Sequence, residues 1–116
     1  MSARARDLSS LKLPPYVKEA LEKLAAQARE ELEDVEIYLF GSYARGDWLL
    51  DSDVDLVVVS PKFEGLSIGE RYALVRRMLP GRISVEVLAY TPEEFEQAKR
   101  RSVILKDASK YWVRIA

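Results

Sequence analysis

The sequence predicts a small α/β (α+β) domain, with a mixed β-sheet that carries helices mainly on one face. Short apolar runs rich in valine and isoleucine alternate with longer segments whose apolar residues recur every three or four positions. Turn and capping residues such as glycine, proline, serine and threonine separate these segments. A chain of 116 residues is also long enough for one domain with a modest core.

The expected elements follow one another in a regular order. We expect a flexible N-terminal arm over 1–13 and a single domain over 14–116. Pro14 and Pro15 open the first helix, because proline is tolerated in a first helical turn. The remaining helices are expected over 42–45 (one short turn), 68–79, and from 91 to beyond 101. The strands are expected over 35–40, 53–60, 83–89 and 111–115, with 56–59 buried on both faces.

Composition excludes several kinds of chemistry. The chain has no cysteine and no histidine, which rules out disulfides, thiolate catalysis, a Ser-His-Asp triad and the usual zinc sites. The net charge of −1 gives no basic field, so direct nucleic-acid binding is not expected. No apolar run approaches the roughly 20 residues that span a membrane, and no signal peptide is visible, so we expect a cytoplasmic protein. Many charges and no asparagine favour a thermophilic source.

Two carboxylates open the second expected strand. On an extended strand Asp53 and Asp55 point to the same face, as carboxylates do when they bind Mg²⁺ beside phosphates. A solvated Asp-Ser-Asp turn is one alternative reading. A calcium loop beginning at Asp51 is another, but Leu56 stands where that loop requires glycine and Lys62 where it requires glutamate.

Further polar residues are placed to complete such a site. Glu86 lies in an apolar strand, on the opposite face from its valine neighbours, and is either an exposed position or a third metal ligand. Gly41 and Ser42 form a turn that can hold phosphate through its backbone, and Arg45 is one helical turn further along. A Gly-Ser turn spaced in this way from Asp-x-Asp is a specific combination.

These motifs resemble a known family. The sequence Gly-Ser-Tyr-Ala-Arg-Gly-Asp at 41–47, followed by Ser-Asp-Val-Asp-Leu at 52–56, resembles the signature of the polymerase-β-like nucleotidyltransferases, and in particular of the minimal nucleotidyltransferases. The resemblance covers roughly residues 15–115 and implies a palm-like fold. It also implies a catalytic and metal-binding role for three carboxylates, with two Mg²⁺ ions, and contact with ATP for four other residues. The carboxylates are Asp53, Asp55 and Glu86, and the others are Gly41, Ser42, Arg45 and Ser52.

The resemblance further implies a reaction and a partner. Family members transfer a nucleoside monophosphate from an NTP to a hydroxyl, and minimal members pair with a helical HEPN-domain toxin. The leading expectation is therefore an antitoxin that attaches AMP from ATP to a tyrosine of such a toxin. A binding-only antitoxin that neutralises its partner by contact, and an enzyme that modifies an aminoglycoside-like small molecule, remain open. A homodimer is compatible with a small sheet that has edges to protect.

Three other groups of residues have two readings each. Trp48, Leu49 and Leu50 either fold back onto the core or contact a partner. Charge runs on the middle and last helices are expected to be solvated faces, with contact to an acidic partner or to RNA bound to it as the alternative. They comprise Arg71, Arg76 and Arg77, and Lys99, Arg100 and Arg101. Tyr111 and Trp112 are expected to close the core rather than to stack on a base.

Overall fold

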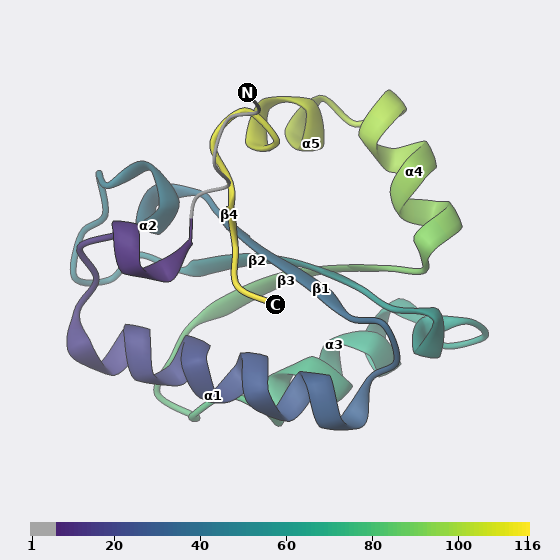
Figure 1. Ribbon diagram of the computed structural model, residues 1–116, viewed down its shortest axis with the longest axis horizontal. Coiled ribbons are helices and arrows are strands. Elements are labelled where there is room, and N and C mark those ends of the chain that lie inside the picture. The colour runs from purple at the N-terminus through teal and green to yellow at the C-terminus, as the bar shows by residue number, and fades with distance from the viewer. Residues whose placement is uncertain (1–6) are drawn as a thin grey trace.

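The computed structural model describes residues 7–116, which form three layers with the sheet in the middle (Figure 1). The long helix α1 (Pro15–Glu31) and helix α3 (Ile68–Arg76) cover one face of the sheet. Helices α4 (Pro92–Arg101) and α5 (Val103–Ala108) lie over part of the other face. This arrangement confirms the predicted small mixed α/β fold.

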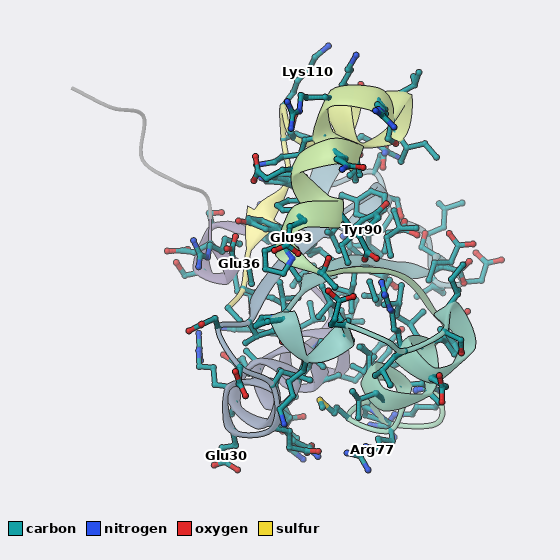
Figure 2. The ribbon with its side chains drawn as sticks, turned by 90° about the vertical axis from the view of Figure 1, so that its right-hand side faces the viewer. Glu30, Glu36, Arg77, Tyr90, Glu93 and Lys110 are labelled. Carbon is teal, nitrogen blue, oxygen red and sulfur yellow. The ribbon has the colours of Figure 1, made fainter. Side chains whose placement is uncertain are left out.

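The side view in Figure 2 shows the same layers edge-on. Tyr90 lies near the level of the sheet, Glu30 and Arg77 lie at the end of the molecule formed by α1 and α3, and Lys110 lies at the opposite end. None of the helices within residues 7–116 is long and apolar enough to cross a bilayer.

The sheet has four strands in the order β3–β2–β1–β4. Strand β1 (Glu36–Phe40) pairs antiparallel with both β2 (Val54–Val59) and β4 (Val113–Arg114). Strand β3 (Val85–Tyr90) pairs parallel with β2, and the connection between them runs through α3. A parallel pair needs such a crossover, and this one leaves β3 at an edge of the sheet.

Both faces of the sheet carry a hydrophobic core. The larger core lies under α1 and α3 and includes the fully buried Ile37, Leu39, Leu56 and Val58. The smaller core lies under α4 and α5 and contains Val57, Val59, Phe95 and Leu105, with Tyr38 stacked on Trp112 at 4.5 Å between ring centroids. Strand β2 is therefore buried on both faces, as its unbroken apolar run predicts, and Trp112 closes a core as expected.

Two predicted boundaries in the middle of the chain are wrong by a few residues. The helix predicted over 68–79 ends at Arg76, because the N–H groups of Met78 and Leu79 donate to carbonyls only three residues back and tighten the chain into turns. The strand predicted over 83–89 starts at Val85 and runs to Tyr90. Residues 83 and 84 connect that turn to the sheet.

The C-terminal helix is interrupted, which the sequence pattern did not predict. Ser102 has extended backbone angles (φ −84°, ψ 122°) and ends α4. Its Oγ then accepts a hydrogen bond from the N–H of Leu105 at 3.2 Å, so the same serine caps the separate helix α5. The final strand, predicted over 111–115, is reduced to Val113–Arg114.

The expected N-terminal arm over 1–13 falls only partly within the described residues, because 1–6 lie outside them. Residues 7–13 contain a single 3₁₀ turn, η1 (Leu8–Ser10), and three leucines of this segment pack against the larger core. The indole N–H of Trp48 donates to the Lys12 carbonyl at 3.1 Å. Trp48 therefore folds back onto the domain, whereas its neighbours Leu49 and Leu50 stay exposed (70% and 86%).

Candidate active site

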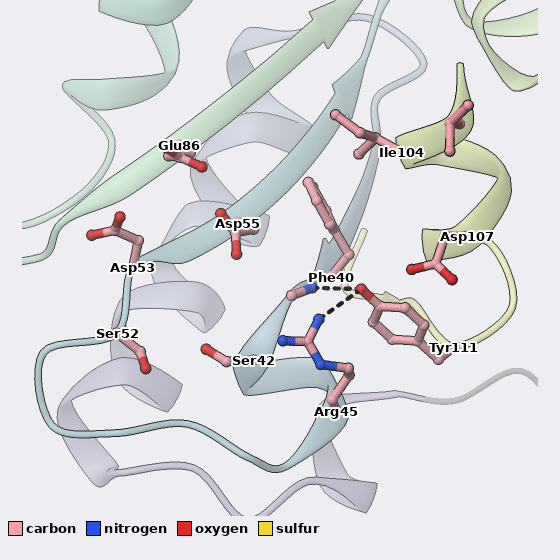
Figure 3. Close-up of a pocket in the computed structure, with 12 residues that line it drawn as sticks. Phe40, Ser42, Arg45, Ser52, Asp53, Asp55, Glu86, Ile104, Asp107 and Tyr111 are labelled. Atoms are coloured by element: carbon pink, nitrogen blue, oxygen red, sulfur yellow. Dashed lines mark hydrogen bonds between the residues drawn. The ribbon is translucent and has the colours of Figure 1, made fainter. Parts of the chain in front are cut away.

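An open cavity of about 660 Å³ lies where β1 and β2 meet the short helix α2 (Ser42–Arg45), with α5 on the opposite wall (Figure 3). All seven residues predicted from the sequence line it: Gly41, Ser42, Arg45, Ser52, Asp53, Asp55 and Glu86. The structure thus brings together three segments that are separated by up to 45 positions in the chain. An active site requires that distant residues come together in one cavity in this way.

Gly41 is the residue that allows the turn and the carboxylate to meet. Its φ is +76°, a conformation that side-chain-bearing residues rarely adopt. A Cβ at this position would lie 1.9 Å from Oδ2 of Asp55, which leaves no room for any side chain. Glycine is therefore needed both for the bend after β1 and for the close approach of Asp55 to the turn.

The carboxylates of Asp55 and Glu86 lie side by side on neighbouring strands. The register pairs Phe40 with Asp55 and Asp55 with Glu86, so the three residues form one row across the same face of the sheet. Burial, the hydrogen bond with Glu86 and the charges of Glu86 and Asp53 together raise the pKa of Asp55 to about 7, with burial as the largest cause. Arg45 opposes this shift only in part.

The donor set fits a hard divalent cation that binds together with phosphates. The side chains of Asp53, Asp55 and Glu86 all offer carboxylate oxygens, which Mg²⁺ prefers, and a bound cation would relieve their mutual repulsion. They do not form a closed cage: Oδ1 of Asp53 accepts a hydrogen bond from Oγ of Ser84, and no group of three such ligands is preassembled within residues 7–116. Mg²⁺ is commonly held by one or two carboxylates plus substrate phosphates, so an incomplete protein shell is compatible with such a site.

Tyr111 occupies a position in the site that sequence reasoning missed. Its hydroxyl accepts hydrogen bonds from the backbone N–H of Gly41 and from Nη1 of Arg45, both at 3.2 Å (Figure 3). The Arg45 guanidinium also lies 5.7 Å from the Tyr111 ring centroid and bonds Asp47 through Nε. The two groups expected to face a phosphate thus hold a phenol oxygen. No local pattern signals this contact, because it joins residues 66 and 70 positions apart.

The other walls of the cavity come from the loop before β2 and from α5. The hydroxyl of Ser52 accepts a hydrogen bond from the Leu49 N–H at 2.8 Å, so Ser52 also closes the loop that leads to the carboxylates. Val103 and Ile104 of α5 form an exposed apolar wall, with Asp107 beside it. The sequence pattern does not predict these α5 residues, because it continues the helix that starts near residue 91 beyond residue 101 without a break.

Comparison with known proteins gives a family for this geometry. The model of the nucleotidyltransferase domain family matches residues 21–111, which include every predicted site residue. No curated protein gives a significant match to the chain.

Two solved structures share the fold. A candidate nucleotidyltransferase from Sulfolobus solfataricus is 24% identical, with 74% of this chain and 82% of the other covered and a TM-score of 0.54. A chain of a toxin–antitoxin structure with AMP-PNP is 20% identical, with 83% of this chain and 72% of the other covered and a TM-score of 0.60. At these identities the likeness establishes the fold alone.

Proposed function

We propose, from the premise that this chain belongs to the nucleotidyltransferase domain family, that it is a Mg²⁺-dependent adenylyltransferase acting on a protein partner. The reaction transfers AMP from ATP to a hydroxyl, with a tyrosine of a HEPN-type toxin as the leading acceptor. One observation carries the proposal. The Gly41 turn packs directly against Asp55, and Asp55 lies beside Glu86 in the same cavity.

The proposed reaction assigns a task to each of these groups. The acceptor oxygen attacks the α-phosphorus of ATP, the bond to the β-phosphate oxygen breaks, and pyrophosphate leaves. Asp53, Asp55 and Glu86 would hold Mg²⁺, which when bound supplies positive charge beside the phosphates. A carboxylate of this cluster takes the proton of the acceptor hydroxyl, so no histidine is required. The Gly41 turn, Ser42 and Arg45 orient the triphosphate.

The choice of ATP and of a protein partner has support from one fold neighbour. The toxin–antitoxin structure that shares this fold contains AMP-PNP, an analogue of ATP. The exposed leucines at 49 and 50 offer apolar surface beside the site, as partner contacts often do. Both observations favour an antitoxin whose nucleotide site faces a second protein.

A binding-only antitoxin is the second candidate, and the hydrogen bonds within the site favour it. Asp53 bonds Ser84, and the donors of Gly41 and Arg45 bond Tyr111. A site in this arrangement has to exchange these bonds for ligand contacts before it can react. A chain that never makes the exchange would neutralise its partner by contact alone.

Intact-mass spectrometry separates the two candidates. The chain is incubated with ATP, Mg²⁺ and a candidate helical partner, and Asp53→Asn serves as a control of nearly equal size. The proposed enzyme adds one or more AMP units to the partner, and the control adds none. Tight binding of an unmodified partner would establish the contact-only role. AMP addition to an aminoglycoside, with none to the partner, would assign the third activity.

A further inference from the structure

We propose that the free edge of β3 is the docking surface for the acceptor. An extended segment of the acceptor protein adds to the sheet beside β3 and presents a hydroxyl side chain to Glu86. The transfer step rests on the proposed function, whereas the docking itself does not. Strand β3 pairs with β2 on one side and with no described strand on the other.

The hydrogen bonds at the two ends of the ladder show which backbone groups of β3 face β2. The N–H of Val54 donates to the Ser84 carbonyl at 2.9 Å, and the N–H of Ser60 donates to the Tyr90 carbonyl at 3.0 Å. Backbone groups alternate in direction along a strand. The even-numbered residues of β3 therefore bond β2, and the odd-numbered residues direct their N–H and C=O groups to the outer edge.

The outer edge of β3 is unused over the part that lies nearest the carboxylates. Of the three odd-numbered residues, Ala89 has its carbonyl occupied by Nη1 of Arg71 at 3.1 Å. Within residues 7–116, the outward N–H and C=O groups of Val85 and Val87 have no hydrogen-bond partner. Alternating unpaired donors and acceptors on an edge are matched by another extended backbone, which is how peptides add to exposed sheet edges.

The register shows where a side chain of the added strand would lie. Phe40, Asp55 and Glu86 form a row across one face of the sheet. A strand beside β3 extends this row by one position, about 4.8 Å beyond Glu86. A tyrosine, serine or threonine at that position on the added strand has its hydroxyl next to the carboxylates and on the same side of the sheet as the cavity.

A groove of about 440 Å³ over this edge fits the flanking part of such a segment. Tyr72 of α3 and Ile104 of α5 belong to helices on opposite faces of the sheet, and both are exposed (40% and 60%). The groove is lined by Phe40, Tyr72, Val85, Glu86, Val87, Leu88 and Ile104. An apolar residue before or after the hydroxyl residue would pack here.

The negative charge beside β3 favours an acceptor peptide, and not a second copy of the chain, as the strand that docks there. Edge-to-edge pairing of two β3 strands would bring two acidic clusters onto adjacent strands, where like charges destabilise pairing. A neutral or basic segment meets no such repulsion and is attracted by Asp53, Asp55 and Glu86. The occupant is thus an extended, hydroxyl-bearing segment with apolar and neutral or basic neighbours.

The test compares Val87→Pro with Val87→Ala. Both variants remove the branched valine side chain, but only proline removes the outward N–H, and it leaves the β2 ladder intact. The probe is a synthetic seven-residue peptide of valine and lysine with a central tyrosine, together with a version N-methylated at alternate residues. The amide chemical shift of Val85 in all proteins, and that of residue 87 in wild type and Val87→Ala, reports docking without any need for catalysis.

Wild type and Val87→Ala should bind the peptide, with shifts centred on β3, and Val87→Pro should bind it at least about tenfold more weakly, as expected for lost ladder bonds. The N-methylated peptide should not bind wild type, a result that does not depend on how the proline variant folds. Equal binding by the two variants, no binding by wild type, or a β3-edge homodimer in solution would each overturn the proposal.

A second readout separates this inference from the proposed function. With ATP and Mg²⁺, wild type and Val87→Ala should add AMP to the peptide, and Val87→Pro should add at least about tenfold less while its ATP affinity is unchanged. Docking at β3 without AMP transfer would uphold the surface and count against the enzyme. AMP transfer that is equal in both variants would uphold the enzyme and overturn the surface.

Discussion

Two charged clusters adjoin β3 and differ in how their charge is balanced. In one, Arg71 of α3 is 9% exposed and its Nη1 lies 2.5 Å from Oε1 of Glu94 on α4. The same guanidinium donates to the carbonyls of Leu66 and Ala89, so it ties α3, α4 and the end of β3 together. Arg71 is therefore buried and paired with the partly exposed Glu94, although its charge run was predicted to be a solvated face. The other cluster holds Asp53, Asp55 and Glu86, all of one sign.

The pKa values of the two clusters move in opposite directions. The hydrogen bond from Arg71 lowers the pKa of Glu94, and the bond from the Thr91 backbone acts in the same direction. Burial and neighbouring carboxylates raise the pKa of Asp55 to about 7. A cluster that neutralises itself contributes to the fold, whereas a cluster of like charges costs stability until a cation binds. The Arg71–Glu94 pair therefore stabilises the fold, and the carboxylate cluster is the one available to the proposed cation.

Asp55→Asn should have the largest effect on the difference between the two clusters. The change removes an oxygen that the proposed mechanism assigns to Mg²⁺ and the central charge of the acidic row, so we expect AMP transfer to fall by at least about 1,000-fold. Without metal, the same change should raise the free energy of unfolding by about 1–2 kcal/mol, less than the full pKa shift would give because the carboxylate is half-exposed. A labelled-ATP transfer assay and urea unfolding in a chelator measure the two effects.

Asp51→Asn provides the control for that experiment. Asp51 is an exposed acidic residue of the adjoining loop and does not line the active-site cavity. We expect it to leave both transfer and stability near the wild-type values. An Asp55→Asn protein that is as active as wild type, or less stable in the chelator, would contradict the assignment of this cluster.

Arg71→Met should have the opposite pattern of effects. It removes the ion pair with Glu94 and the ties to two carbonyls, and we expect a loss of about 2–3 kcal/mol in the free energy of unfolding. The rate of AMP transfer by the folded variant should stay within about twofold of wild type, because Arg71 is not among the residues that line the active-site cavity. Urea unfolding and a transfer assay well below the transition test this. A large loss of transfer with little loss of stability would reverse the roles of the two clusters.

The pH dependence of stability should distinguish the clusters by sign. The folded-state pKa of Asp55 is raised from 3.8 to about 7, so its contribution is favourable at low pH and is lost as the pH rises through 7. The folded-state pKa of Glu94 is lowered. Its stabilising contribution is therefore present above the pKa that Glu94 has in the unfolded chain, and it is lost as the pH falls below that pKa. In a chelator, the advantage of Asp55→Asn over wild type should therefore grow between pH 4 and pH 7, to about 1–2 kcal/mol.

Glu94→Gln supplies the complementary profile. Its disadvantage relative to wild type should be full at neutral pH and shrink below the usual pKa of glutamate, as wild-type Glu94 becomes protonated. Unfolding free energies at several pH values measure both profiles. Two differences that stay constant with pH would show that neither carboxylate is perturbed by folding.

The parts of the fold that the sequence predicts well are those with a strong local signal. The apolar run from Leu56 to Val59 gives a doubly buried strand, and the Thr91 capping box gives the start of α4. The Gly41 turn and the Asp53–Asp55 pair are also local patterns, and the structure brings both to one cavity. The alternation of Glu86 with valine places it correctly on the face of Asp55.

The parts that were missed depend on contacts between distant segments. The break at Ser102 has no proline or glycine to announce it, because serine both ends α4 and caps α5. Arg71 becomes buried only when α3 packs beside Glu94 of α4. Tyr111 enters the site through bonds to residues near position 41. Periodicity and spacing show which face of a segment is apolar, whereas these three features depend on contacts with other segments.

Tyr111→Phe should have the smallest effect of these changes, and it tests what Tyr111 contributes to the proposed nucleotide site. The change removes the oxygen that accepts bonds from Gly41 and Arg45 but keeps the ring beside the guanidinium. If those donors are to contact phosphate, the hydroxyl competes with the nucleotide for them. We therefore expect ATP to bind about two- to fivefold more tightly in the presence of Mg²⁺, which corresponds to about 0.5–1 kcal/mol.

Calorimetric titration with a non-hydrolysable ATP analogue measures that affinity. Tyr16→Phe is the matched control, since Tyr16 lies outside the active-site cavity and loses the same single oxygen. Weaker binding by Tyr111→Phe would mean that the hydroxyl contacts the nucleotide directly and stabilises the bound state. Tighter binding would mean that it holds the phosphate donors in place only while the site is empty. Whether the affinity for the analogue rises or falls thus decides between two roles of the Tyr111 hydroxyl: holding the empty site in place, or contacting the bound nucleotide.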